Sequence, residues 1–231
     1  MNQKHPKLDN YTKVRPIARI MDTKLRHMLE EFGIPHVTLK KTQLNEVIEI
    51  FERINTSGTK LTVFDLLIAK LSLHKINLKK LWDKVQKDHK DVHDYLEKSK
   101  NSSQGLLILH AMSLAYTKTG SCKRTDILKI FENMNSSKED FEKKWEDMVE
   151  WTDKAIELLE DQTDMGFGVH NQKFLPSESM IPVLAALLRE INNFIPEKQK
   201  YCNKKMRYWY WCSALTNVYS GSSDTQKTSD Y

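Results

Sequence analysis

The stretch SKEDFEKKWEDMVEWTDKAIELLED, residues 137–161, decides the fold class, because its hydrophobic residues recur at helical spacing. Residues three or four apart form one inner stripe: Phe141, Trp145, Met148, Thr152, Ala155 and Leu159. Ser137 and Asp140 stand at the start with the spacing of a capping box, in which each side chain bonds the other residue's backbone N–H. The pattern predicts a long amphipathic helix that ends near Asp161.

The same spacing recurs along most of the chain, and glycine and proline, which interrupt helices, number only seven and six. Further helices are predicted over residues 15–33, 43–55, 62–71, 77–97, 106–116 and 124–132, from Ser177 or Ser179 onward, and over 196–219. Only residues 34–39 have the alternation of a strand. We therefore expect a mainly α fold, a multi-helix orthogonal bundle with at most one or two short strands near residues 34–41.

The composition excludes several classes of protein. Hydrophobic residues make up 39% and charged residues 29% of the chain, which is typical of a folded globular protein. No apolar run reaches the 18 residues of a membrane span, and the N-terminus lacks the pattern of a signal peptide. The cysteines, Cys122, Cys202 and Cys212, form no C-x-x-C pair. These features predict reduced thiols, a cytoplasmic location and no membrane partner.

The net charge of +5 is unevenly distributed. Residues 1–41 carry +5 and residues 196–212 carry +4, whereas residues 137–164 carry −7. A basic face can bind the phosphates of nucleic acid. Helices with solvated faces of alternating sign would give the same totals, and the small overall excess favours that second interpretation.

The basic segment near the C-terminus is followed by four aromatic residues, Tyr208–Trp211. Lys200, Lys204 and Arg207 share one helix face, so we expect them to be candidates for non-specific contacts with DNA phosphates. The rings could stack on bases, but four consecutive residues cover every face of a helix. The spacing of Tyr208 and Trp211 with Leu215 predicts instead a stripe buried in the core.

Two histidines have the spacing of half a metal site. His89 and His93 lie one turn apart on a predicted helix, which is a spacing used by zinc ligands. Lys90 stands where a metalloprotease would carry its general-base glutamate, and no third ligand is evident. The pair remains a weak candidate, and we expect neither a metal nor another cofactor.

The run FERINTSGTKL, residues 51–61, closes one predicted helix and opens another. Asn55 can bond the turn backbone, and Gly58 can take a positive φ. Physical chemistry alone indicates a helix–loop–helix corner.

The same run resembles the F-x-R-x-N-x-x-G-x-x-L segment of a large prokaryotic family, domain of unknown function 262, whose members include the GmrSD-type modification-dependent restriction enzymes. Residues 174–182 and 209–223 are similar to later segments of that family, in family order. The resemblance therefore covers most of residues 34–231. It marks these residues as family motif positions without assigning them a role: Phe51, Arg53, Asn55, Gly58 and Leu61.

Family members also carry an N-terminal D-G-Q-Q-R motif in a β-rich domain and often a C-terminal H-N-H nuclease domain, and this chain contains neither. The resemblance thus implies that residues 1–41 are the edge of a missing β-rich domain. Residues 42–221 would form the helical domain, and residues 222–231 are expected to be a disordered tail. A strand edge left uncovered at residues 34–41 would pair with a partner subunit or a second copy.

No P-loop, G-x-G-x-x-G or G-x-S-x-G motif occurs, so no residue is predicted to be catalytic. The resemblance implies a non-catalytic helical module of a DNA-defence protein that contacts nucleic acid or a partner subunit. The alternative is a divergent or truncated nuclease or NTPase of the same family, with its catalytic motif outside this chain. A gene remnant without function is a third interpretation.

Overall fold

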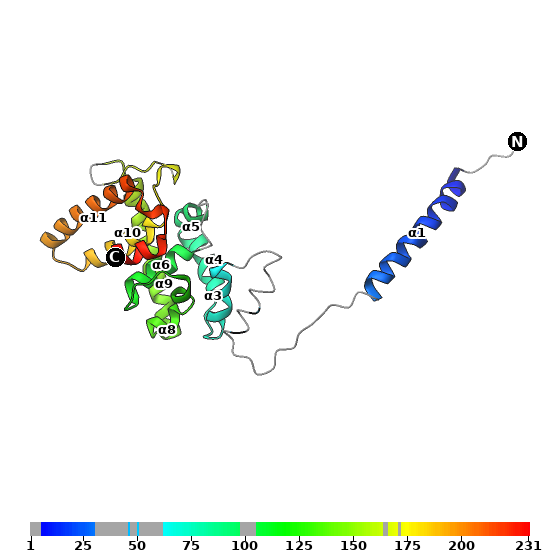
Figure 1. Ribbon diagram of the computed structural model, residues 1–231, viewed down its shortest axis with the longest axis horizontal. Helices are drawn as coiled ribbons and strands as arrows, with labels where there is room; N and C mark the ends of the chain where they lie inside the picture. The colour runs from blue at the N-terminus through cyan, green and yellow to red at the C-terminus, as the bar shows by residue number, and fades with distance from the viewer. Residues whose placement is uncertain are drawn as a thin grey trace. The chain divides into compact units, whose positions relative to one another are not determined.

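The computed structural model describes residues 6–30, 46, 50, 62–97, 105–163, 166–170 and 172–231 (Figure 1). The chain divides into two compact units, Met1–Ile50 and Phe51–Tyr231. The described residues contain no strand, and the mainly α prediction is confirmed. The strand and the domain boundary predicted between residues 34 and 42 fall outside the described residues.

The first unit contains α1 (Pro6–Glu30), which begins nine residues before the predicted start. Five of its apolar residues are each more than half exposed: Ile17, Ile20, Met21, Leu25 and Met28. An ion pair between Arg26 and Asp22, one turn apart, lies on its polar surface. The described part of this unit therefore leaves the apolar face of α1 uncovered.

The described part of the second unit contains ten α-helices and two short 3-10 helices: α3 (Val63–Ser72), α4 (Leu78–Asp88), α5 (Lys90–Glu97), α6 (Leu106–Tyr116), α7 (Arg124–Ile127), α8 (Ile130–Met134), α9 (Lys138–Glu160), η2 (Gln172–Phe174), α10 (Met180–Asn192), α11 (Pro196–Thr216), η3 (Val218–Ser220) and α12 (Ser223–Asp230). Its centre is formed by α6, α9 and α10, which pack on one another. The predicted inner stripe of α9, from Phe141 to Leu159, is buried throughout. Burial of this stripe confirms the helical spacing from which it was predicted.

A polar junction joins the three central helices. The guanidinium of Arg189 on α10 donates to the carboxylate of Asp147 on α9 at 2.8 Å. The hydroxyl of Tyr116 on α6 and the indole N–H of Trp151 donate to the same carboxylate. One carboxylate thus accepts bonds from all three helices, which fixes their relative register.

The start predicted at residue 62 agrees with that of α3, whereas the capping box predicted for α9 forms only one of its two hydrogen bonds. Thr62 and Asp65 form a complete capping box at the start of α3. Ser137 accepts the backbone N–H of Asp140, but the Asp140 carboxylate bonds Lys144 at 2.7 Å. The capping box predicted at the start of α9 is therefore incomplete, because the Asp140 carboxylate pairs with Lys144 one turn onward.

The single helix predicted over residues 77–97 is wrong. It is divided into α4 and α5 at His89, whose backbone leaves the helical region at φ −131° and ψ 59°. His89 still donates its N–H to Val85, while its carbonyl accepts from His93. The chain therefore turns between two helices without losing these backbone bonds.

The prediction of a disordered tail at residues 222–231 is also wrong. Ser223–Asp230 forms α12, in red in Figure 1, which packs against α10 and η3. The predicted last helix ends earlier than expected, at Thr216, because Asn217 adopts a left-handed conformation at φ 52°. The composition of α12 is polar, but its Lys227 side chain is only 2% exposed.

Gly105 sits at the start of α6 with a φ of +75°, a conformation that favours glycine. An added Cβ would lie 2.8 Å from Cε3 of Trp82 and 3.2 Å from Cη2 of Trp145. Gly120 has a φ of +55°, but the atom nearest to its added Cβ is 3.8 Å away. Replacing either glycine by a residue with a Cβ would strain the backbone. Only at Gly105 would the added atom also clash with neighbouring side chains.

We expect Gly105→Ala to lower the free energy of unfolding by about 2 kcal/mol, because it adds overpacking to backbone strain. Gly120→Ala should lower it by about 1 kcal/mol, since only the strain applies. Urea denaturation of both variants measures the difference. Equal losses would show that the tryptophans give way and that packing at Gly105 is loose.

Candidate functional sites

The family motif positions cannot be placed. Phe51, Arg53, Asn55, Gly58 and Leu61 all lie outside the described residues. Their role stays a prediction.

The two candidate histidines have separate partners. The Nδ1 atom of His89 lies 3.4 Å from a carboxylate oxygen of Asp153. The Nδ1 atom of His93 lies 3.3 Å from Asp94, and its ring packs on Trp82 with centroids 5.0 Å apart. Within the part of the chain that the structure describes, no three His, Cys, Asp or Glu side chains gather as a metal-ligand set. His89 thus lies at the break between α4 and α5, whereas His93 lies on α5, and each has a different partner.

The predicted buried stripe on α11 is wrong. Tyr208, Trp211 and Leu215 are 74%, 47% and 83% exposed. The buried residues are Met206, Tyr210 and Ser213, one face around. The Tyr210 ring packs on Phe167 with centroids 3.9 Å apart, and Phe167 comes from the loop between α9 and α10. The contact with Phe167 therefore explains why Tyr210, rather than Tyr208 or Trp211, is buried.

The exposed side of α11 consequently combines rings with basic groups, and we call it the α11 face: Lys200, Tyr201, Lys204, Tyr208, Trp211 and Leu215. Successive members are spaced so that they share one side of the helix. The face extends along about 22 Å, at roughly 1.5 Å per residue. Basic groups and aromatic rings in one row resemble the pattern of single-strand binding surfaces.

Two neighbouring residues complete this surface. Arg207 is half-buried beside the α11 face, with its guanidinium 5.7 Å from the centroid of the Phe167 ring. The ammonium of Lys205 lies 4.7 Å from the centroid of the Tyr201 ring. Of the three residues predicted to contact phosphates, Lys200 and Lys204 are therefore exposed, whereas Arg207 is half-buried near the Phe167 ring.

The partly exposed Trp211 ring packs on two other aromatic rings. It meets the Tyr210 ring edge-on at a centroid distance of 5.3 Å and the Phe167 ring at 6.4 Å. Two residues earlier in the chain, the Trp209 indole donates to Asp230 of α12 at 2.8 Å. The exposed ring therefore rests on a fixed support, which lowers the entropy lost when it contacts a ligand.

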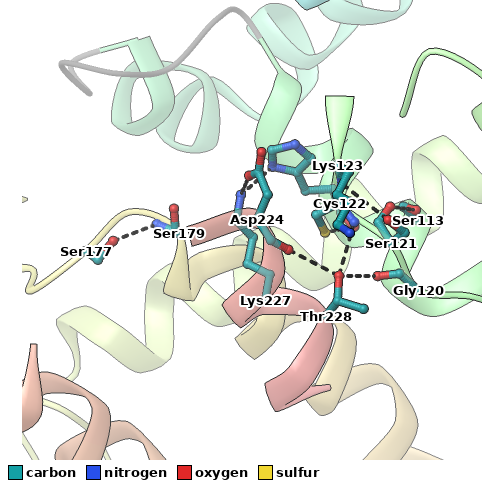
Figure 2. Close-up of polar contacts among 11 residues, drawn as sticks. Ser113, Gly120, Ser121, Cys122, Lys123, Ser177, Ser179, Asp224, Lys227 and Thr228 are labelled. Atoms are coloured by element: carbon teal, nitrogen blue, oxygen red, sulfur yellow. Dashed lines mark hydrogen bonds and ion pairs between the residues drawn. The ribbon is translucent and has the colours of Figure 1, made fainter. Parts of the chain in front are cut away.

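A second site lies where α12 meets α6. Figure 2 shows Lys227, Asp224 and Thr228 of α12 facing Cys122 and Gly120 of the segment that follows α6. The Cys122 backbone N–H donates to the Thr228 hydroxyl at 3.2 Å, and that hydroxyl lies 3.1 Å from the Gly120 carbonyl. These bonds attach α12 to a segment more than a hundred residues earlier in the chain.

The Lys227 ammonium lies at the centre of this second site. It is 2.9 Å from the Asp224 carboxylate and 2.9 Å from Nδ1 of His110 on α6. Because an ammonium can only donate, His110 accepts through Nδ1 and carries its own proton on Nε2. Burial, and then the Lys227 charge, lower the pKa of His110 well below its ordinary value. The imidazole is therefore neutral.

Cys122 is fully buried beside these groups, and its thiol lies 3.8 Å from the His110 carbonyl oxygen. Burial raises the pKa of the Cys122 thiol to about 12. A thiol held in its protonated form is a poor nucleophile. The site lacks the reactive thiolate of a cysteine enzyme.

A cavity of about 280 Å³ opens onto the buried lysine, and we call it the Lys227 pocket. Its lining residues come from α3, α6, α7, the start of α10 and α12, with Cys122: Val63, Leu106, Leu107, His110, Cys122, Arg124, Ile127, Ser177, Glu178, Ser179, Ser223, Asp224 and Lys227. Sequence reasoning missed this site because the segment from 222 onward lacks any apolar periodicity. The spacing of Asp224 and Lys227, suited to a helical ion pair, was the only local signal.

None of the helices in the described part of the chain combines sufficient length with sufficient apolar character to cross a membrane.

Comparisons with known proteins give one distant relative. The chain is 24% identical over 209 residues to the uncharacterized protein MJ0686 of Methanocaldococcus jannaschii. The match covers 89% of this chain and 33% of that protein, so the chain spans about a third of the length of its relative. No family model matches the chain, and no solved structure matches it.

Proposed function

We propose that this chain is a non-catalytic helical module of a cytoplasmic DNA-defence protein of the GmrSD type, and that it contacts DNA through the α11 face. Its catalytic parts would reside in other segments or in a partner subunit. The resemblance at residues 51–61, 174–182 and 209–223 supports the family assignment. The composition of the α11 face supports the choice of ligand.

The observation that carries the proposal is the exposure of large rings among lysines. Tyr208 and Trp211 are exposed on the same side as Lys200 and Lys204. A soluble domain gains stability by burying such rings, so leaving them exposed in a row is a cost that ligand binding offsets. Lysines favour a polyanion over an apolar protein partner.

Unpaired bases fit this face better than a duplex. Rings stack on base faces, which a regular double helix keeps covered by its own stacking. The lysines contact phosphates and carry no sequence information. We therefore expect non-specific binding that is stronger for single strands than for duplex DNA.

One observation favours the alternative of an enzyme whose catalytic motif lies outside this chain. The relative MJ0686 is about three times as long as the matched region. In that case the α11 face would deliver DNA to a nuclease or NTPase domain. The catalytic domain could also belong to a partner subunit, or to a second copy of this chain, bound through residues 34–41.

We expect the triple variant Lys200→Gln, Lys204→Gln, Arg207→Gln to bind a 12-residue oligothymidylate with a much weaker salt dependence. Three phosphate contacts give a slope of log K against log salt of about −2.1 on single strands and about −2.7 on duplex DNA. Loss of all three should bring the slope close to zero. Fluorescence anisotropy across a salt series measures it.

The matched control is Lys79→Gln, Lys80→Gln, Lys87→Gln, which removes the same charge from exposed positions on α4. The control should keep the wild-type slope. An unchanged slope in the first variant would overturn the choice of face and point to Arg15, Arg19 and Arg26 of α1. Absence of binding even at low salt would overturn the DNA proposal and favour the partner-subunit function.

A further inference from the structure

We propose that the Lys227 pocket binds the phosphate group of a small phosphomonoester whose body carries hydroxyl groups. This inference is independent of the DNA-binding proposal, since the pocket and the α11 face share no residue. It rests on the donors that line the pocket, on the burial of the ammonium and on the size of the cavity.

The Lys227 ammonium has more donors than the described acceptors satisfy. It carries three N–H groups, and the described structure gives it two acceptors, Asp224 and His110. The lysine side chain is 2% exposed, whereas the Asp224 side chain is 44% exposed. Among the described residues, the half-exposed carboxylate of Asp224 is the one charged partner of this buried cation, which therefore remains incompletely compensated. An anionic ligand in the adjoining pocket would complete its coordination.

Further donors line the same pocket. His110 presents a neutral imidazole whose proton is on Nε2, because Nδ1 accepts from the lysine. Arg124 also lines the pocket, and a guanidinium is a group suited to bidentate contact with phosphate. Ser179 stands at the N-cap of α10, and its side chain makes no capping bond. Donors from four elements therefore surround a single space, which suits the several oxygens of a phosphate better than the two of a carboxylate.

The remaining lining residues define the body of the ligand. Glu178 and Asp224 are acceptors for hydroxyl groups, and Val63, Leu107 and Ile127 offer apolar contact. A volume of about 280 Å³ is at the lower end of known ligand sites. This combination fits a phosphate on a compact, hydroxyl-bearing skeleton, such as a sugar phosphate. It does not fit a polymer, because the pocket is too small to hold one.

The experiment measures binding of ribose 5-phosphate to the full chain by isothermal titration calorimetry, with ribose and inorganic phosphate as reference probes. We expect ribose 5-phosphate to bind more tightly than inorganic phosphate, and ribose not to bind. Ser179→Ala and Arg124→Gln keep the Lys227–Asp224 pair, and each should weaken binding by about tenfold. Lys227→Met should weaken it by a hundredfold or more.

The matched control is Lys118→Met, which removes a lysine that is exposed in the segment after α6. It should bind ribose 5-phosphate as the wild type does, and so should the triple variant of the α11 face. Circular dichroism establishes that each variant is folded. If Lys227→Met does not fold, Ser179→Ala and Arg124→Gln decide the result. Wild-type affinity in both of these variants would overturn the proposal, as would the absence of ribose 5-phosphate binding to the wild type.

Discussion

Replacing Trp145 by alanine is expected to lower the free energy of unfolding by about 3–5 kcal/mol. The indole of Trp145, on α9, is 1% exposed and belongs to the main hydrophobic cluster. Its removal opens a cavity that a closely packed core cannot fill by small shifts. A loss of this size is a large part of the total stability of a typical domain. Urea denaturation followed by circular dichroism measures it.

Trp211→Ala is the matched control, because it removes the same side chain from an exposed position. It should cost less than about 1 kcal/mol of stability, since most surface substitutions have small effects. The same variant should weaken binding to oligothymidylate by about fivefold to a hundredfold, the range for loss of one stacked base. Similar stability losses at Trp145 and Trp211 would contradict the described packing of α11.

Acidification below pH 6.5 is expected to destabilise the chain through His110. The pKa of this imidazole is lowered by burial in the folded state and ordinary in the unfolded state. The unfolded chain therefore binds more protons below pH 6.5, and folding stability falls as the pH falls. While the folded imidazole stays neutral, the slope contributed by this group approaches about 1.4 kcal/mol per pH unit.

The variant His110→Gln tests this pH dependence, because its carbonyl can still accept from Lys227 and it does not titrate. Urea unfolding between pH 7.5 and 4.5 should show a steeper decline for the wild type than for this variant. The two proteins differ only at residue 110, so the difference between their declines reports the contribution of His110. Parallel declines would show that His110 is not buried as a neutral group.

The central helices were predictable because packing and periodicity agree there. Along α9, six residues spaced by three and four all reach the core, and α6 has the bounds that its apolar run predicts. One side of α9 is clearly more apolar than the rest, and burial of that side determines both the helix and its orientation. The sequence of α6 is apolar on all sides, and residues 107–114 are all buried, so its pattern predicts a core helix without one preferred face.

Orientation was not predictable for α11. The run of Tyr208 to Trp211 places a ring on every side of the helix, so no face is more apolar than another. The choice of Tyr210 depends on Phe167, which arrives from a loop distant in sequence. A contact between segments, rather than a local pattern, decides which rings are exposed.

The Lys227 pocket could not be predicted for a similar reason. His110 was predicted within an apolar helix, Cys122 was taken only as a reduced thiol, and Lys227 lay in a segment expected to be disordered. None of them has a motif spacing relative to the others. Only the docking of α12 brings them within hydrogen-bond distance.

The long separation between His110 and Lys227, 117 residues, also bears on how the chain is assembled during translation. At roughly 5–20 residues per second, His110 is synthesised about 6–23 s before Lys227. Throughout that interval the Cys122 thiol lacks the helix that covers it in the finished protein. The bundle therefore cannot close before α12 has been synthesised, and protection of this thiol from alkylation marks the moment of closure.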